Sequence, residues 1–118
     1  MKIIVCGAGQ VGFDIARQLS VEDNDVTVID HDTERIRKVG EALDVQTFQG
    51  FASYPDILDR AGADTADMLI AVTLSDEINM VSCQVAHTLF NVPTKMARVR
   101  HNAYLEPSWR HLFSRDHM

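Results

Sequence analysis

Two hydrophobic patterns alternate along this sequence. Short runs of consecutive apolar and β-branched residues, such as 2–6 and 25–30, are typical of strands buried on both faces of a parallel sheet. Between these runs, apolar residues recur at every third or fourth position, as on one face of a helix. The alternation predicts βαβ units. The predicted strands are residues 2–6, 25–30, 45–49, 68–72 and 95–99, and the predicted helices begin near residues 10, 33, 53 and 76.

Right-handed crossovers between these strands give the sheet order 3-2-1-4-5. The predicted fold class is therefore α/β, a Rossmann-type doubly wound parallel sheet in three layers. Residues 1–118 are expected to form one domain, which we interpret as a fragment of a longer regulator. In the tail, Pro107 suits a first helical turn, and Trp109, Leu112 and Phe113 share one side that needs a surface to cover.

Local signals add detail to the helices. Asp32 is a good N-cap for the second helix, and Ser53 with Asp56 predicts a capping box that opens the third. The residues expected to face the sheet are Val11, Ile15, Ala16 and Leu19 in the first helix and Ile78, Val81, Val85 and Leu89 in the fourth.

Composition and charge narrow the class of protein. With 46% hydrophobic and 24% charged residues, the chain has the make-up of an ordinary folded domain. Its formal net charge is −6 and it has no basic stripe, which argues against nucleic acid as the main partner, because phosphates require clustered Lys and Arg. We read no secretion signal, and Cys6 and Cys83 lack a CxxC spacing, so we expect free thiols in a cytosolic core. The histidines have no spacing that predicts a metal site.

The most specific motif is a G-x-G-x-x-G run over residues 7–12, directly after the first strand and at the start of a helix. Gly7 permits a tight turn, Gly9 lets a pyrophosphate approach the backbone, and Gly12 allows close packing of helix and strand. The helix N-terminus offers N–H groups to phosphate oxygens. Asp30 follows the loop by about 20 residues, the spacing of an acid that binds ribose hydroxyls and disfavours NADP. We interpret this pattern as a nucleotide site.

The other residues at the strand ends extend this site, because ligands of doubly wound sheets lie beyond those ends. Phe51 is assigned either to an adenine face or to ordinary packing, and Asp32 to a cap rather than a ligand contact. Arg98 and Arg100, two positions apart on one strand face, suit phosphate oxygens or, alternatively, ion pairs with carboxylates. The candidate nucleotide-binding residues are Gly7, Ala8, Gly9, Gln10, Val11, Gly12, Asp30, His31, Phe51, Ala52, Thr73, Ser75, Arg98 and Arg100.

The sequence provides no visible acid–base or nucleophile pair beside the expected cofactor, and no second domain to hold a substrate. A dehydrogenase needs both. We therefore predict a ligand sensor without catalytic residues. NAD(H) is the first choice of ligand, and ATP or ADP in the same site is the second. One alternative is the cofactor half of an NAD-dependent oxidoreductase. A redox-sensing transcriptional regulator is another.

Over essentially its whole length the chain resembles the TrkA-N, or RCK/KTN, family of potassium-channel and transporter regulators. The resemblance rests on residues 2–12, 49–53, 55–58, 61–64, 66–68, 71–80, 83–86 and 97–100. It implies a cytoplasmic subunit, peripheral on the inner face of the membrane, that forms a homodimer or tetramer of RCK domains and gates a Trk-type potassium transporter. Family ligand contacts carried over by the resemblance fall on Gly7, Gly9, Gln10, Val11, Asp30, Thr73, Ser75 and Arg100, with Arg98 less certain. The family often has a polar residue where this chain has Phe51.

Overall fold

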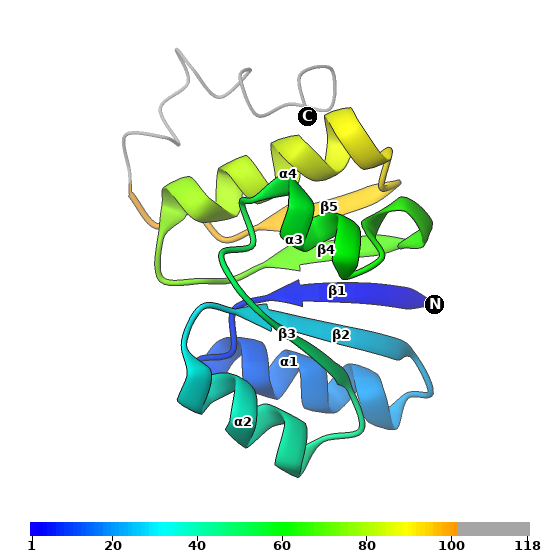
Figure 1. Ribbon diagram of the computed structural model, residues 1–118, viewed down its shortest axis with the longest axis vertical. Coiled ribbons are helices and arrows are strands. Elements are labelled where there is room, and N and C mark those ends of the chain that lie inside the picture. The colour runs from blue at the N-terminus through cyan, green and yellow to red at the C-terminus, as the bar shows by residue number, and fades with distance from the viewer. Residues whose placement is uncertain (102–118) are drawn as a thin grey trace.

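A five-stranded parallel sheet with the order β3-β2-β1-β4-β5 forms the centre of the computed structural model, which describes residues 1–101 (Figure 1). This order confirms the predicted fold class. The predicted helix in the tail, with Trp109, Leu112 and Phe113, lies outside the described residues. The elements are β1 (Lys2–Cys6), α1 (Gln10–Val21), β2 (Asp25–Asp30), α2 (Thr33–Ala42), β3 (Gln46–Gln49), α3 (Pro55–Arg60), the 3-10 helix η1 (Ala63–Thr65), β4 (Met68–Ala71), α4 (Asp76–Phe90) and β5 (Thr94–Ala97).

The two faces of the sheet are covered by different helices. Alternate residues of β1 separate into two cores, because successive side chains of a strand point to opposite faces. Ile3 and Val5 pack in the cluster that includes residues of α1 and α2, whereas Ile4 and Cys6 pack with α3, η1 and α4. Every residue of β1 after Lys2 is buried. This double burial explains why the strand is a continuous apolar run.

Helix starts confirm one local prediction and correct another. The Asp32 carboxylate accepts hydrogen bonds from the backbone N–H groups of Glu34 and Arg35, as an N-cap does. The capping box predicted at Ser53 is wrong, because α3 starts one residue later. Tyr54 is its N-cap without a side-chain bond, and Pro55, whose fixed φ suits a first helical position, begins the helix.

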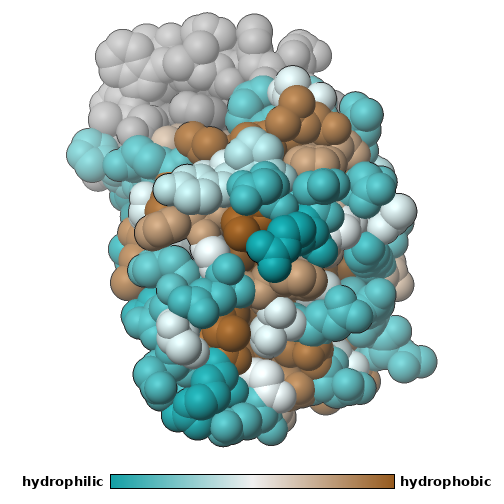
Figure 2. All heavy atoms as spheres, viewed as in Figure 1, coloured by the Kyte–Doolittle hydropathy of each residue, from teal (hydrophilic) through white to brown (hydrophobic). Residues whose placement is uncertain are grey.

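The face that α4 turns to the sheet was predicted only in part, because Val85 packs against the core, as does the adjacent Ala86, whereas Val81 and Leu89 do not. The side chains of Val81 and Leu89 are 46% and 57% exposed. The buried residues of α4 are Asn79, Met80, Ser82, Cys83 and Ala86. Small side chains allow the helix to approach the sheet closely, and the buried polar groups find hydrogen-bond partners, so the less apolar face is the one that packs. Figure 2 shows apolar side chains reaching the surface over α4. In α1, Val11 is likewise 42% exposed rather than buried.

Cys6 and Cys83 are free and buried. Burial raises the pKa of both thiols, that of Cys83 to about 12, so both stay protonated at neutral pH. Among residues 1–101, no helix combines the length and apolar character needed to cross a bilayer.

Candidate functional site

A cavity of about 450 Å³ lies beyond the C-terminal ends of the strands. The predicted site residues converge on it with the exception of Ala8 and Gly12, which are not among its lining residues. Sequence reasoning missed several others. The lining residues are Gly7, Gly9, Gln10, Val11, Ile29, Asp30, His31, Arg35, Gly50, Phe51, Ala52, Val72, Thr73, Leu74, Ser75, Ile78, Arg98 and Arg100.

The glycine loop is shaped by backbone contacts that leave no room for a side chain at Gly7 or Gly12. Gly7 has φ +113°, and a Cβ there would lie 2.9 Å from the carbonyl oxygen of Val72. A Cβ on Gly12 would overlap the carbonyl of Gly7, so Gly12 lets α1 start directly against the loop. At Gly9 a Cβ would meet nothing within 4 Å, because its Cα faces the cavity. The loop therefore presents bare backbone and the N-terminus of α1 to the cavity, an arrangement that suits phosphate oxygens.

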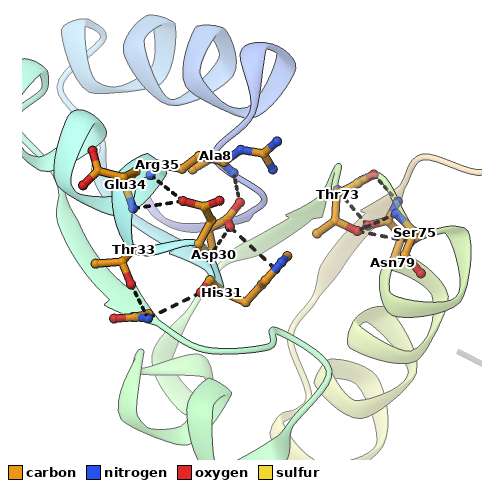
Figure 3. Close-up of polar contacts among 11 residues, drawn as sticks. Ala8, Asp30, His31, Thr33, Glu34, Arg35, Thr73, Ser75 and Asn79 are labelled. Carbon is orange, nitrogen blue, oxygen red and sulfur yellow. Dashed lines mark hydrogen bonds and ion pairs between the residues drawn. The ribbon is translucent and has the colours of Figure 1, made fainter.

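Asp30, at the end of β2, has a structural role as well as a place in the cavity wall. One carboxylate oxygen accepts a 2.7 Å hydrogen bond from the Ala8 backbone N–H, and the other accepts a 2.8 Å bond from the Asp32 N–H (Figure 3). The residue is only 6% exposed. Each carboxylate oxygen can accept a further bond. The acid thus holds the glycine loop and keeps acceptor capacity for a hydroxyl.

Aromatic and cationic side chains stand beside Asp30. The His31 and Phe51 rings are stacked with centroids 4.8 Å apart, and Tyr54 lies against Phe51 at 5.4 Å. The Arg35 side chain extends from the first turn of α2 towards the Ala8 loop (Figure 3). Phe51 therefore has a packing partner within the chain and still lines the cavity.

The loop after β4 forms the opposite wall. Ser75 caps α4 by accepting a hydrogen bond from the Ile78 N–H. The Thr73 hydroxyl accepts a bond from the Ser75 N–H. Asn79, buried in α4, bonds to three atoms of Thr73 (Figure 3). Sequence reasoning treated this helix face as apolar and gave Asn79 no role.

Arg98 and Arg100 lie beyond β5, because the strand ends at Ala97 rather than at residue 99. The Arg98 Nη2 donates to the carbonyls of Val72 and Thr73 at 3.1 and 3.0 Å. Its Nε is buried and has no hydrogen-bond partner among the described residues. Neither guanidinium forms an ion pair within 4.0 Å with a carboxylate of residues 1–101.

The backbone after β5 is held by Asp76 at the start of α4. Its carboxylate accepts hydrogen bonds from the N–H groups of Arg100 and His101 at 2.9 and 2.7 Å. These bonds lower the pKa of Asp76 below its usual value. The acid thereby places Arg100 at the cavity through the main chain, not through its guanidinium.

Taken together, the cavity has one wall of bare backbone and a carboxylate and another that carries hydroxyls and two arginines. Phosphate oxygens suit the glycine loop and the guanidiniums, and vicinal hydroxyls suit the carboxylate. Among the described residues, no group of three or more His, Cys, Asp or Glu is placed to hold a metal ion.

Comparison with known sequences gives a consistent set of relatives. The family model for the TrkA-N domain matches residues 3–113. A Trk system potassium uptake protein TrkA from Azorhizobium caulinodans is 58% identical over the whole chain, and one from Halomonas elongata is 58% identical over 89% of it. The chain spans 26% and 23% of the lengths of these two relatives.

Solved structures share the fold at low sequence identity. The TrkA-N domain of the inner membrane protein ybaL from Escherichia coli has a TM-score of 0.83 at 18% identity and aligns with 96% of this chain and 82% of its own. The AMP-bound Kef CTD from Shewanella denitrificans scores 0.76 at 23% identity, with 92% and 68% aligned. The NAD-bound GsuK channel scores 0.74 at 17%, with 96% and 20% aligned. An oxidoreductase, saccharopine dehydrogenase from Saccharomyces cerevisiae, scores 0.68 at 15%, with 94% and 23% aligned.

Proposed function

This chain belongs to the TrkA-N domain family, and we propose that it is the nucleotide-sensing part of a regulatory subunit that gates a Trk-type potassium transporter. The single observation that carries the proposal is the convergence on one cavity of the glycine loop, Asp30 and the two arginines. A phosphorylated adenosine offers complementary groups to all three.

The proposed ligand is NAD(H), with ATP or ADP as the alternative in the same cavity. A pyrophosphate suits the open backbone at Gly9 and the N-terminus of α1. The buried Nε–H of Arg98, which has no hydrogen-bond partner within residues 1–101, supports an oxyanion on the opposite wall. Relatives described as bound to NAD and to AMP support an adenine nucleotide without choosing between the two.

We further propose that the domain works as a homodimer or tetramer in the cytoplasm, attached to the inner face of the membrane through the transporter. The names of the Trk relatives support this partner. The exposed Val81 and Leu89 on α4 support contact with a second chain. Nucleotides that bind one arrangement of paired domains more tightly would shift the population towards it, which is how the signal would pass to the transporter.

Calorimetry of NADH, NAD, ATP and ADP with the 118-residue chain tests nucleotide binding. At least one of them should bind with a dissociation constant below about 1 mM, the weak end of specific affinities. The matched control is Gly9→Val, because a Cβ at Gly9 meets nothing within 4 Å among the described residues and lies at the cavity, so the variant should lose binding and keep the fold. Absence of binding by all four nucleotides would refute the proposal. Oxidation of NADH by a small substrate in the presence of this chain would favour the oxidoreductase alternative instead.

A further inference from the structure

Asn79 has an unusually complete set of hydrogen bonds for a side chain that is not among the residues lining the cavity. The residue is 0% exposed. Its amide nitrogen donates to the carbonyl oxygens of Thr73 at 3.1 Å and Arg98 at 2.8 Å. Its oxygen accepts from the Thr73 N–H at 2.8 Å and the Thr73 hydroxyl at 2.7 Å. Two donors and two acceptor positions are the full capacity of a primary amide.

These bonds join two segments that are distant in the sequence. Thr73 follows β4, Arg98 follows β5, and both line the cavity. Arg98 adds a second connection between the same two segments, because its Nη2 donates to the carbonyls of Val72 and Thr73. We infer that Asn79 is a positioning residue of the nucleotide site. Without lining the cavity itself, Asn79 fixes the main chain at Thr73 and Arg98, which belong to the arginine-bearing wall. This inference rests on the proposed function.

The same bonds set the chemistry that Thr73 offers to a ligand. A hydroxyl has one proton, and that of Thr73 is directed to the Asn79 oxygen or, at 3.1 Å, to the Ser75 carbonyl. Its oxygen also accepts from the Ser75 N–H. Thr73 is therefore left with acceptor capacity only. It suits a ribose hydroxyl or a carboxamide N–H, whereas the guanidinium of Arg98 suits a phosphate.

Asn79→Asp is the most selective variant, because it keeps the shape of the side chain. The carboxylate retains the acceptors for the Thr73 N–H and hydroxyl, but it sets a second oxygen against the carbonyls of Thr73 and Arg98. The affinities for NAD and ADP should fall at least tenfold, measured where the variant is fully folded. Ser82→Ala is the control, because Ser82 is equally buried on α4 and, among residues 1–101, its hydroxyl bonds only to Ile78 of its own helix. Its affinities should match those of the parent chain.

A measurement on the unaltered chain removes dependence on the folding of the variant. In an NMR titration with ADP, the side-chain amide signals of Asn79 should shift together with the backbone signals of Gly7 and Gly9. The side-chain amide of Asn24, which donates to Leu19 near the N-terminal end of β2, is the internal control and should not move. Shifts in the glycine loop with an unmoved Asn79 amide would overturn this inference alone. A glycine loop that does not respond to ADP or NAD would overturn the proposed function with it.

Discussion

The two walls of the cavity both suit phosphate oxygens, but they are built differently. The loop wall, residues 7–12 with Asp30, consists of backbone that tolerates no side chain at Gly7 or Gly12 and is held by one buried carboxylate. The arginine wall, residues 73–75 with Arg98 and Arg100, presents side chains to the cavity, and the main chain of both arginines is held by side chains of α4, the Asn79 amide and the Asp76 carboxylate. The loop wall depends on the close fit of its backbone, and the arginine wall depends on the positive charge of its side chains. Substitutions at Gly7, Gly12 and Asp30 should therefore affect folding, whereas substitutions of the arginines should mainly affect affinity.

Gly12→Ala should have the largest effect, because its Cβ would overlap the backbone carbonyl of Gly7, which cannot turn aside as a side chain can. We expect a loss of more than about 3 kcal/mol in the free energy of unfolding, beyond the usual range for overpacking. Urea denaturation followed by circular dichroism measures it. Gly9→Ala is the control, with a cost of at most about 1 kcal/mol from the poorer N-cap. Equal stabilities for the two variants would contradict the assignment of the loop wall to shape.

Asp30→Asn comes next, because an amide has one oxygen where the carboxylate uses two. Either the Ala8 or the Asp32 N–H would face an NH2 group. Losing a charge-assisted bond and leaving a buried donor unpaired should cost about 2 kcal/mol. The midpoint of urea unfolding gives the change. Asp25→Asn, at the exposed start of the same strand, should have little effect. An unaltered midpoint for Asp30→Asn would show that the acid does not hold the loop.

Arg100→Met probes the arginine wall. The guanidinium is exposed and contacts only the Leu74 carbonyl at 3.5 Å among described residues, so stability should hardly change. Loss of a charge-assisted bond to phosphate should weaken nucleotide binding about tenfold. Calorimetry and a melting curve on the same sample separate the two effects. If the melting temperature fell and the affinity did not, the functional difference between the walls would be reversed.

Asp76→Asn should give the smallest effect, and one that depends on pH. Hydrogen bonds from Arg100 and His101 lower the folded pKa of this acid below its ordinary value of 3.8. Its contribution to stability is therefore present above about pH 4 and lost as the pH falls through the folded pKa. Melting temperatures of the parent and the variant should differ at pH 6 and converge as the pH is lowered below the ordinary value of 3.8. Glu77→Gln is the neighbouring control. A gap that persisted undiminished at the acid end would rule out the carboxylate as its source.

The loop wall could be predicted from the sequence because its signal is local. Glycine spacing, a strand before it and an acid about 20 residues later are all read along the chain. Thr73, Ser75, Arg98 and Arg100 of the arginine wall were also predicted, from their places at strand ends. The support of this wall by Asn79 was missed, because hydrophobic periodicity assumes that apolar side chains face the core. In α4 that assumption failed, since the polar residues Asn79 and Ser82 are buried. Asn79 bonds to the loops at Thr73 and Arg98, and Ser82 bonds to Ile78 of its own helix. Arg35 was overlooked as a cavity residue, although its place in the first turn of α2, shortly after Asp30, is a signal that the sequence contains.

The two hydrogen bonds that the Asp30 carboxylate accepts from backbone N–H groups have a consequence for the rate of ligand binding. Because folding has already fixed the glycine loop, an arriving nucleotide does not need to order it, and little conformational entropy is lost there on association. Association rates should then be similar for different adenine nucleotides. Discrimination among them would arise in how long each one stays bound.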